Sequence, residues 1–154
     1  QFSFYWYHFL TCELKWLKMW QDKLKDTDLL LIILQTIIPT LQYADKFSKN
    51  LNVENIFKII GQADRKSINQ ISISAAAVSE VTGIPRATCI RKLNRLVLLG
   101  FLIRDSKTKR FYVNQNSVDR TSNVLTKNNV DLSIGIYSEF LSIILNSLLF
   151  NNNN

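Results

Sequence analysis

The chain contains few residues that interrupt regular structure, since only four glycines and two prolines occur among its 154 residues. Few tight turns are therefore available, and long helices are favoured over a strand-rich sandwich. Hydrophobic residues make up 47% of the chain and charged residues 20%, which is ordinary globular usage and argues against general disorder. The length fits one domain, or a small domain with helical extensions.

Cysteine and histidine are also scarce. Cys12 and Cys89 are the only cysteines, and they lie far apart without a metal-ligand spacing. A disulfide framework requires more cysteines in a secreted protein, so we expect a reducing, cytoplasmic location. His8 is the only histidine, which excludes a multi-histidine metal site. We expect neither a metal nor a cofactor. The sequence lacks a phosphate-cradling glycine loop, a paired carboxylate motif and a nucleophile elbow, so we do not expect an enzyme.

Long hydrophobic runs are limited to two segments. The run over residues 29–38 is too short to cross a bilayer. The run over residues 132–150 is long enough, but it contains Glu139, Asn146 and four serines. Because this run shows no clean polar face, we expect a partner protein to cover it, with insertion into a membrane as the alternative. Residues 2–10 lack a basic leader and a cleavage site, so they do not resemble a signal peptide.

Acidic residues are almost absent from one stretch, residues 84–110. This stretch carries eight basic side chains against the single acid Asp105, so it accounts for the whole net charge of +7. A uniformly solvated surface would not concentrate charge in this way, and a local positive field indicates an extended anionic partner. Nucleic acid is the first candidate, and an anionic membrane surface is the second. The basic residues are Arg86, Arg91, Lys92, Arg95, Arg104, Lys107, Lys109 and Arg110.

Periodic apolar residues predict helices in the N-terminal third. From Trp6 to Leu24 they recur every three or four positions, with charged residues on the opposite side, as in an amphipathic helix. A second helix is expected to begin at the N-cap Thr27, and Pro39 is expected to kink or end it. The elements expected to follow are a short helix over 53–62, a polar loop over 63–70 and a short strand over 71–73.

The pattern that comes next is a short helix, a glycine turn, a basic helix, a glycine and a basic hairpin. Gly83 supplies the left-handed conformation that ends the first helix, and Pro85 suits the first position of the next. In the second helix Cys89 and Leu93 belong to an inward stripe, whereas Arg91 does not. This order is the plan of a winged helix-turn-helix. The expected elements are helices over 75–81 and 86–99, and strands over 101–104 and 110–113.

The same residues resemble the DNA-binding region of the MarR and IclR families of transcription regulators. One run is similar to the turn that leads into the recognition helix of those families, and a second run is similar to the segment that leads into their wing. These runs are Thr82-Gly83-Ile84-Pro85-Arg86-Ala87-Thr88 and Leu96-Val97-Leu98-Leu99-Gly100-Phe101-Leu102. The resemblance implies a homodimer that reads two half-sites. It also implies that Arg86, Thr88 and Arg91 meet the major groove or its flanking phosphates.

The expected fold is mainly α with a small β-wing. A winged helix-turn-helix over residues 53–115 is expected to bind DNA. It is expected to be flanked by two dimerisation segments, an N-terminal helical segment over 1–52 and a C-terminal helix over 116–150. A disordered tail is expected over 151–154. The abundance of Asn and Ile further indicates an AT-rich, bacterial genome.

The expected function is that of a sequence-specific transcription regulator that binds double-stranded DNA. A homodimer would read a palindromic site with a recognition helix (85–99) and a basic wing (102–113). The alternative is an adaptor that binds protein through its apolar terminal helices, without specific DNA binding. A small-molecule or oxidant effector is left open, because the sequence does not identify one.

The candidate DNA-binding residues have different expected roles. Arg86 and Arg91 could pair with guanine edges or grip phosphates. Lys92 and Arg95 are expected to contact the DNA backbone rather than bases. Lys107, Lys109 and Arg110 are expected at the wing tip, beside the minor groove or adjacent phosphates. The alternative for Arg86 and Arg91 is a solvated charge on a helix, and the alternative for the tip residues is a solubilised hairpin. The full set is Pro85, Arg86, Thr88, Arg91, Lys92, Arg95, Arg104, Lys107, Lys109 and Arg110.

The two cysteines receive different interpretations. Cys89 falls on the inner stripe of its helix and is expected to be a small core residue. Cys12 lies near Tyr5 and Tyr7 in the first helix. This placement is similar to that of the reactive cysteine of some MarR-type peroxide sensors, and the resemblance implies a redox sensor. A packed, inert thiol is nevertheless the favoured interpretation, because the sequence does not show a lowered pKa.

Overall fold

The computed structural model describes residues 1–47, 53–117 and 127–151. The chain divides into two compact units: a smaller one made of Gln1–Lys25 with Val124–Asn154, and a larger one spanning Asp26–Asn123. The boundary therefore falls at Asp26, whereas the sequence placed it at residue 52. The predicted disordered tail lies mostly outside the described residues, and Asn151 is the last residue of a helix.

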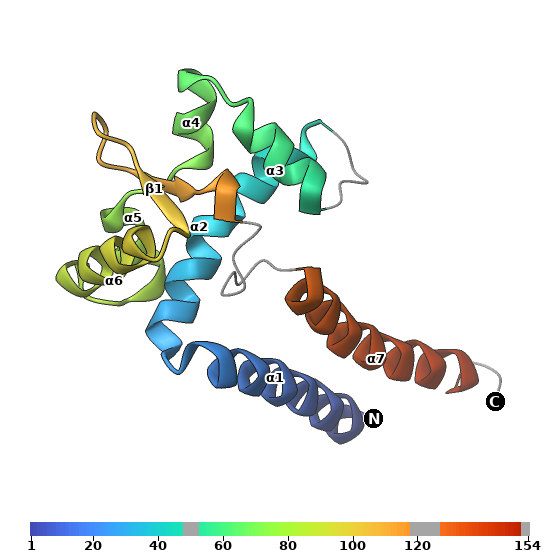
Figure 1. Ribbon diagram of the computed structural model, residues 1–154. Coiled ribbons are helices and arrows are strands. Elements are labelled where there is room, and N and C mark those ends of the chain that lie inside the picture. Colours follow the sequence, from blue (N-terminus) through green and yellow to red (C-terminus); the bar gives the residue numbers. More distant parts are fainter. Residues whose placement is uncertain (48–52, 118–126, 152–154) are drawn as a thin grey trace. The chain divides into compact units, whose positions relative to one another are not determined.

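The described residues are mainly helical with one small antiparallel sheet, as the sequence predicted (Figure 1). In the sheet Leu102 faces Val113 and Arg104 faces Phe111. A 3-10 turn, Gln115–Ser117, follows the second strand. The helices are α1 Phe2–Leu24, α2 Thr27–Asp45, α3 Val53–Gly61, α4 Arg65–Ile71, α5 Ala75–Thr82, α6 Arg86–Leu98 and α7 Lys127–Asn151, and the strands are β1 Leu102–Arg104 and β2 Phe111–Val113.

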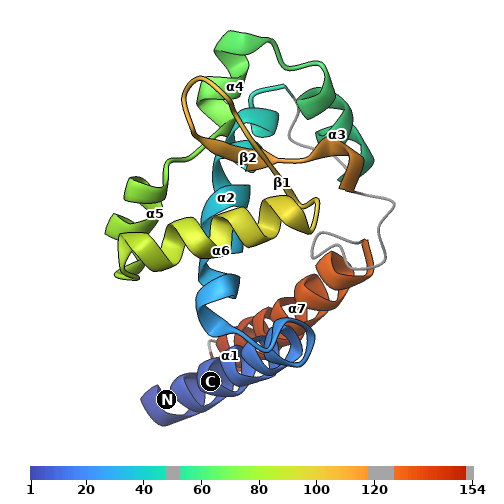
Figure 2. The ribbon, with the colours of Figure 1, turned by 60° about the vertical axis from the view of Figure 1, so that its left-hand side comes forward.

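Helix α2 is the central element of the larger unit, and α3, α4, α5, α6 and β2 all pack against it (Figure 2). Its N-cap is Asp26, not Thr27 as predicted, and the Asp26 carboxylate accepts the Leu29 N–H at 3.0 Å. Of the two predicted effects of Pro39, a kink or an end, the end does not occur, since α2 continues to Asp45. An internal proline costs roughly 3 kcal/mol. Side chains of α2 are buried both before Pro39, as at Ile37, and after it, and this burial offsets the cost of the proline.

Helix α4 occupies most of the segment that was predicted to be a loop. Asp64 caps it by accepting the Ser67 N–H at 2.8 Å, and the Tyr43 hydroxyl of α2 donates to the Ser67 hydroxyl at 2.8 Å. Ile71 is fully buried at its last position. The predicted strand over 71–73 is reduced to one antiparallel bridge, in which Ile73 exchanges both backbone hydrogen bonds with Phe111.

The smaller unit is a pair of packed helices, α1 and α7. Cys12 and Trp20 of α1 are buried. The Tyr137 hydroxyl of α7 donates to the Glu13 carboxylate at 3.1 Å. Burial and this hydrogen bond raise the pKa of Tyr137 to about 12, so the phenol remains a neutral donor at physiological pH.

Among the residues that the structure describes, two helices have the length and apolar composition of membrane spans. They are Thr27–Asp45, which is α2, and Asn128–Leu149 within α7. The first is the core helix of the larger unit and is 44% buried there, so packing accounts for its composition. In the second, no residue of the most apolar 18-residue window is buried within the structure.

Candidate nucleic-acid interface

The turn between α5 and α6 sets the direction in which α6 leaves the core. Ser74 caps α5 by accepting the Ala77 N–H at 3.1 Å. Gly83 ends the helix in the left-handed conformation, with φ of 71°, a geometry that costs a side chain roughly 1–2 kcal/mol. The Ser79 hydroxyl then donates to the Ile84 carbonyl at 2.7 Å. These bonds fix α6 relative to α5 before any ligand is present.

One side of α6 is anchored in the core of the larger unit. Cys89, Leu93 and Leu96 are fully buried, and so is Val78 of α5. The Cys89 thiol lies 3.5 Å from the Ile84 carbonyl, to which it donates, and burial raises the pKa of the thiol. Cys89 is therefore a core residue, as predicted. Pro85 occupies the N-cap position, one residue before the first helical position that was predicted for it.

The opposite side of α6 is an outward face with helical spacing. Ala87, Arg91 and Leu98 are exposed on it, and the half-buried Asn94 completes the spacing of four, three and four residues. Arginine and asparagine are the side chains best suited to hydrogen-bond guanine and adenine edges. Asn94 was not selected from the sequence, although its position three residues after Arg91 would have indicated it.

Two further exposed arginines, Arg86 and Arg95, flank this outward face. Arg86 lies in the first turn of α6, and Arg95 lies on the flank beside Arg91, together with the half-buried Thr88. Within the part of the chain that the structure describes, none of the three arginines forms an ion pair. Their charge is therefore available to an external anion.

The loop between β1 and β2 presents two further lysines, Lys107 and Lys109, both exposed. The Asp105 carboxylate organises this loop by accepting the Thr108 N–H at 2.6 Å and the Thr108 hydroxyl at 2.7 Å. These bonds, together with the charge of Arg65, lower the pKa of Asp105. Lys109 adopts the left-handed conformation, with φ of 58°. The single acid of the basic stretch thus shapes the loop.

The two arginines of the hairpin, Arg104 and Arg110, have different surroundings. Arg110 was predicted at the tip, but its guanidinium reaches back to Ser72, donating to the hydroxyl at 2.9 Å and to the carbonyl at 2.6 Å. Arg104 remains exposed, and its guanidinium lies 5.4 Å from the centre of the Phe111 ring. Arg110 therefore braces the hairpin, and the charge at the tip comes from the two lysines.

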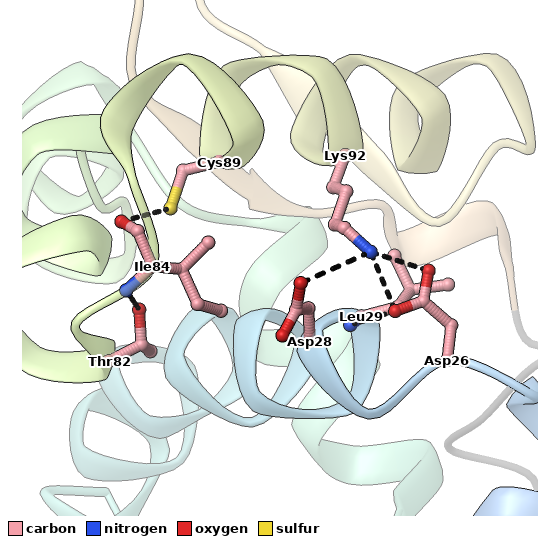
Figure 3. A network of polar contacts seen from close by, with 7 residues as sticks. All are labelled: Asp26, Asp28, Leu29, Thr82, Ile84, Cys89 and Lys92. Carbon is pink, nitrogen blue, oxygen red and sulfur yellow. Dashed lines mark hydrogen bonds and ion pairs between the residues drawn. The ribbon is translucent and has the colours of Figure 1, made fainter.

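Lys92 does not contribute to the outward surface, which corrects the expectation that it contacts the DNA backbone. It is 9% exposed, and its ammonium lies 2.6 Å from both carboxylate oxygens of Asp26 and 3.6 Å from Asp28 (Figure 3). Burial alone would raise the pKa of Asp26, but the hydrogen bonds from Lys92 and the Leu29 N–H outweigh it, and the pKa is lowered. The ion pair ties α6 to the N-terminus of α2.

Two cations that the sequence analysis missed lie beside the hairpin. Arg65 and Lys66, both exposed, belong to the first turn of α4. They line a hollow of about 290 Å³ together with Asp105, Lys107 and Thr108. The sequence placed Arg65 and Lys66 in a loop and outside the basic stretch. Their position next to Lys107 follows only from the packing of α4 on the sheet.

Cys12 lies in the seam between α1 and α7. It is 4% exposed, and its thiol donates to the Ile136 carbonyl at 3.8 Å. Burial, and then the nearby Glu13 carboxylate, raise the pKa of the thiol. A raised pKa disfavours the reactive thiolate, so this environment gives the redox interpretation no support. Among the residues that the structure describes, no group of three His, Cys, Asp or Glu side chains could hold a metal ion.

The structure thus gathers most of the predicted residues on α6 and the hairpin loop, while Lys92 and Arg110 turn inward. No protein-family model, curated protein or solved structure matches the chain.

Proposed function

We propose that the larger unit is a winged helix-turn-helix that binds double-stranded DNA sequence-specifically and regulates transcription in the cytoplasm. In this proposal α5 and α6 form the helix-turn-helix, and the β1–β2 hairpin is the wing. The observation that carries the proposal is the outward face of α6, which contains Arg91 and Asn94 and is flanked by cations that form no ion pair among the described residues. The other side of α6 is buried in the core.

The proposal divides the residues between two kinds of contact. Arg91 and Asn94 are placed to read base edges in the major groove, and Ala87 is small enough to touch a thymine methyl group. The cations around them bind phosphates, which position the protein but carry no sequence information. The phosphate-binding set is Arg86, Arg95, Arg104, Lys107, Lys109, Arg65 and Lys66, with Thr88 as a neutral hydroxyl donor.

The test is selection of bound duplexes from a random library, followed by titration of the selected duplex at several salt concentrations. We expect one enriched sequence. We also expect the logarithm of the binding constant to fall linearly with the logarithm of the salt concentration, with a slope of about −0.9 for each phosphate neutralised. A chain that enriches no sequence and binds with no salt dependence is not a DNA-binding protein. A stable complex with a protein partner would then favour the adaptor function.

Removing the two cations of α4 is expected to change the salt dependence and not the sequence preference. The double variant Arg65→Gln with Lys66→Gln should lower the magnitude of the salt slope by about one to two, because each lost phosphate contact removes about one. Lys58→Gln, on α3, is the matched control that removes an exposed charge away from the hairpin. An unchanged slope in the double variant would exclude α4 from the interface.

The Lys109→Gly variant separates charge from backbone geometry at the wing. Glycine adopts the left-handed conformation of this position without the penalty that a side chain meets, so thermal stability should not fall. The affinity for DNA should fall, with a slope smaller in magnitude by about 0.9. Melting curves and titrations of the same preparations check both parts; unaltered binding would place Lys109 outside the contact.

A further inference from the structure

Helices α1 and α7 run antiparallel, so α1 begins at the end of the pair where α7 ends (Figures 1 and 2). Phe9 meets Phe140, with ring centroids 6.2 Å apart, and further along α1 Trp16 meets Tyr137 at 6.3 Å. The residue number rises on α1 while it falls on α7. The first turns of α1 therefore lie beside the last turns of α7.

The charged residues of this helix pair are confined to one of its two ends. Residues 2–12 of α1 and 140–151 of α7 contain no Asp, Glu, Lys or Arg, and we call them together the charge-free end. Beyond them the charged end begins, where Lys15 and Glu139 meet in an ion pair of 3.1 Å between the helices. The other charged residues of the two helices are Glu13, Lys18, Asp22, Lys23, Lys127 and Asp131.

The charge-free end exposes large apolar side chains in more than one direction. Phe4 is 40% exposed and Trp6 is 50% exposed. Residues two positions apart in an α-helix are rotated by about 200°, so these two rings lie on opposite sides of α1. A partner protein that packs against one side would leave the other side in water. The exposed apolar residues of this end are Phe2, Phe4, Trp6, Tyr7, Phe9, Leu10, Leu141, Leu145, Leu148 and Leu149.

Aromatic rings are concentrated at the charge-free end. Six of the eight residues 2–9 are Phe, Tyr or Trp. Tyr and Trp combine an apolar ring with a polar O–H or N–H, and both are enriched where the membrane meets water. Trp6 and Tyr7 are both exposed, so their rings are available to an external partner. The change from an aromatic, uncharged end to a charged end matches the change from acyl chains to headgroups.

The length of the charge-free end fits one leaflet of a bilayer and not its whole thickness. Residues 2–12 rise by about 15 Å, which is half of a hydrocarbon core of roughly 30 Å. If the segment Asn128–Leu149 spanned the membrane, Glu139 would lie at its middle, where a charge is most costly. In one leaflet only the charge-free end leaves water, and the ion pair between Lys15 and Glu139 remains outside the acyl chains.

We propose that the charge-free end of the α1–α7 pair inserts into one leaflet of a phospholipid bilayer and attaches the protein to a membrane surface. The charged end remains among the headgroups, and α7 does not span the membrane. This attachment differs from a span over residues 132–150, because α1 contributes the aromatic part of the inserted surface. The inference goes beyond the proposed function, since it concerns the smaller unit alone and does not require DNA.

Flotation of the full chain with neutral phosphatidylcholine vesicles tests the inference. Neutral lipid is chosen because the cations of the larger unit would bind an anionic vesicle by charge alone. The parent should float with the vesicles. Leu10→Glu and Leu145→Glu should each lower the partition coefficient by about tenfold or more, because a carboxylate would enter the acyl region. Both leucines are exposed, so far-UV circular dichroism without vesicles should match that of the parent.

Leu14→Glu is the matched control. Leu14 is 66% exposed and lies one turn from Leu10, but it belongs to the charged end, between Glu13 and Lys15. This variant should float as the parent does. The inference is overturned if the parent does not float, or if Leu14→Glu lowers the partition coefficient as much as Leu10→Glu. A parent that stays out of the vesicle fraction and sediments with twice the chain mass would identify a second copy as the occupant instead.

Trp6 provides a second, spectroscopic measurement of which end enters the lipid. All three tryptophans of the chain lie in α1, and Trp16 and Trp20 belong to the charged end. Phosphatidylcholine that is brominated in its acyl chains should quench the fluorescence of the parent. Trp6→Phe should lose most of that quenching while still floating, because phenylalanine keeps the apolar ring. Quenching that persists in full in Trp6→Phe would show that the charge-free end does not enter the acyl region.

Discussion

Replacing Arg91 with alanine is expected to remove much of the discrimination between the selected duplex and a scrambled one. A bidentate pair between an arginine and a guanine contributes about 1–3 kcal/mol of discrimination, so binding at each half-site should weaken by roughly five- to 150-fold. Arg91 is exposed and forms no ion pair among the described residues, so its removal should leave folding intact. Fluorescence anisotropy with both duplexes, together with melting curves, measures the two effects.

The Arg91→Lys variant distinguishes base reading from charge. Lysine retains the positive charge but lacks the planar fork that matches a guanine edge. Binding to the scrambled duplex should therefore persist in Arg91→Lys, while the preference for the selected duplex falls. Asn94→Ala should in turn relax the preference at a neighbouring adenine. If Arg91→Ala and Arg91→Lys both discriminate as the parent does, α6 does not read bases and the proposed function loses its central residue.

The second large effect is expected from Lys92, and it concerns stability. Lys92→Met keeps the aliphatic chain but leaves Asp26 without its ammonium partner. Removing one partner of a buried ion pair costs about 3–5 kcal/mol. Asp26 is partly exposed, and solvent screening lowers the expected loss below that range, to about 2–3 kcal/mol. Chemical denaturation of the parent, Lys92→Met, Asp26→Asn and the double variant gives the coupling between the two residues. A stable Lys92→Met variant with weakened DNA binding would restore Lys92 to the interface.

The same ion pair predicts how stability changes with pH. The folded-state pKa of Asp26 is lowered, so its contribution is fully present above the pKa of an unfolded aspartate, about 3.9, and is lost as the pH falls through the folded-state value. Asp26→Asn keeps a good N-cap for α2 but cannot titrate. The difference in unfolding free energy between parent and variant should therefore shrink as the pH falls below about 4. A difference that stays constant down to acid pH would contradict this assignment.

The sequence predicted those elements whose signals are local. Ser74, Gly83 and Gly100 mark the ends of α5 and α6, and the structure places a cap or a positive φ at each of them. Helix α4 escaped prediction because a helix this short holds too few apolar residues to show a period, and its burial depends on contacts with α2 and β2. The continuation of α2 past Pro39 likewise depends on tertiary burial, which local helix propensities do not predict.

The composition of the candidate site could be predicted better than the roles of its members. The cluster of basic residues indicated an anionic partner, but charge in a sequence does not reveal which cations are already paired. Lys92 meets Asp26 from 66 positions away, and Arg110 meets Ser72 from 38 positions away. These two side chains were assigned to DNA because their partners lie outside the basic stretch. Arg65 and Lys66 were missed for the converse reason, since folding brings them to the hairpin from α4.

The two hydrogen bonds from Arg110 to Ser72 have a consequence for the thermodynamics of association. They join the end of the hairpin to the segment that enters α5, so the hairpin and the two helices form one pre-ordered body. Binding to DNA then requires little folding. The heat-capacity change of binding, measured by calorimetry, should therefore equal the value expected from the surface that two rigid partners bury. Arg110→Ala should make that change more negative and the association entropy less favourable, because the hairpin would have to be ordered on the DNA.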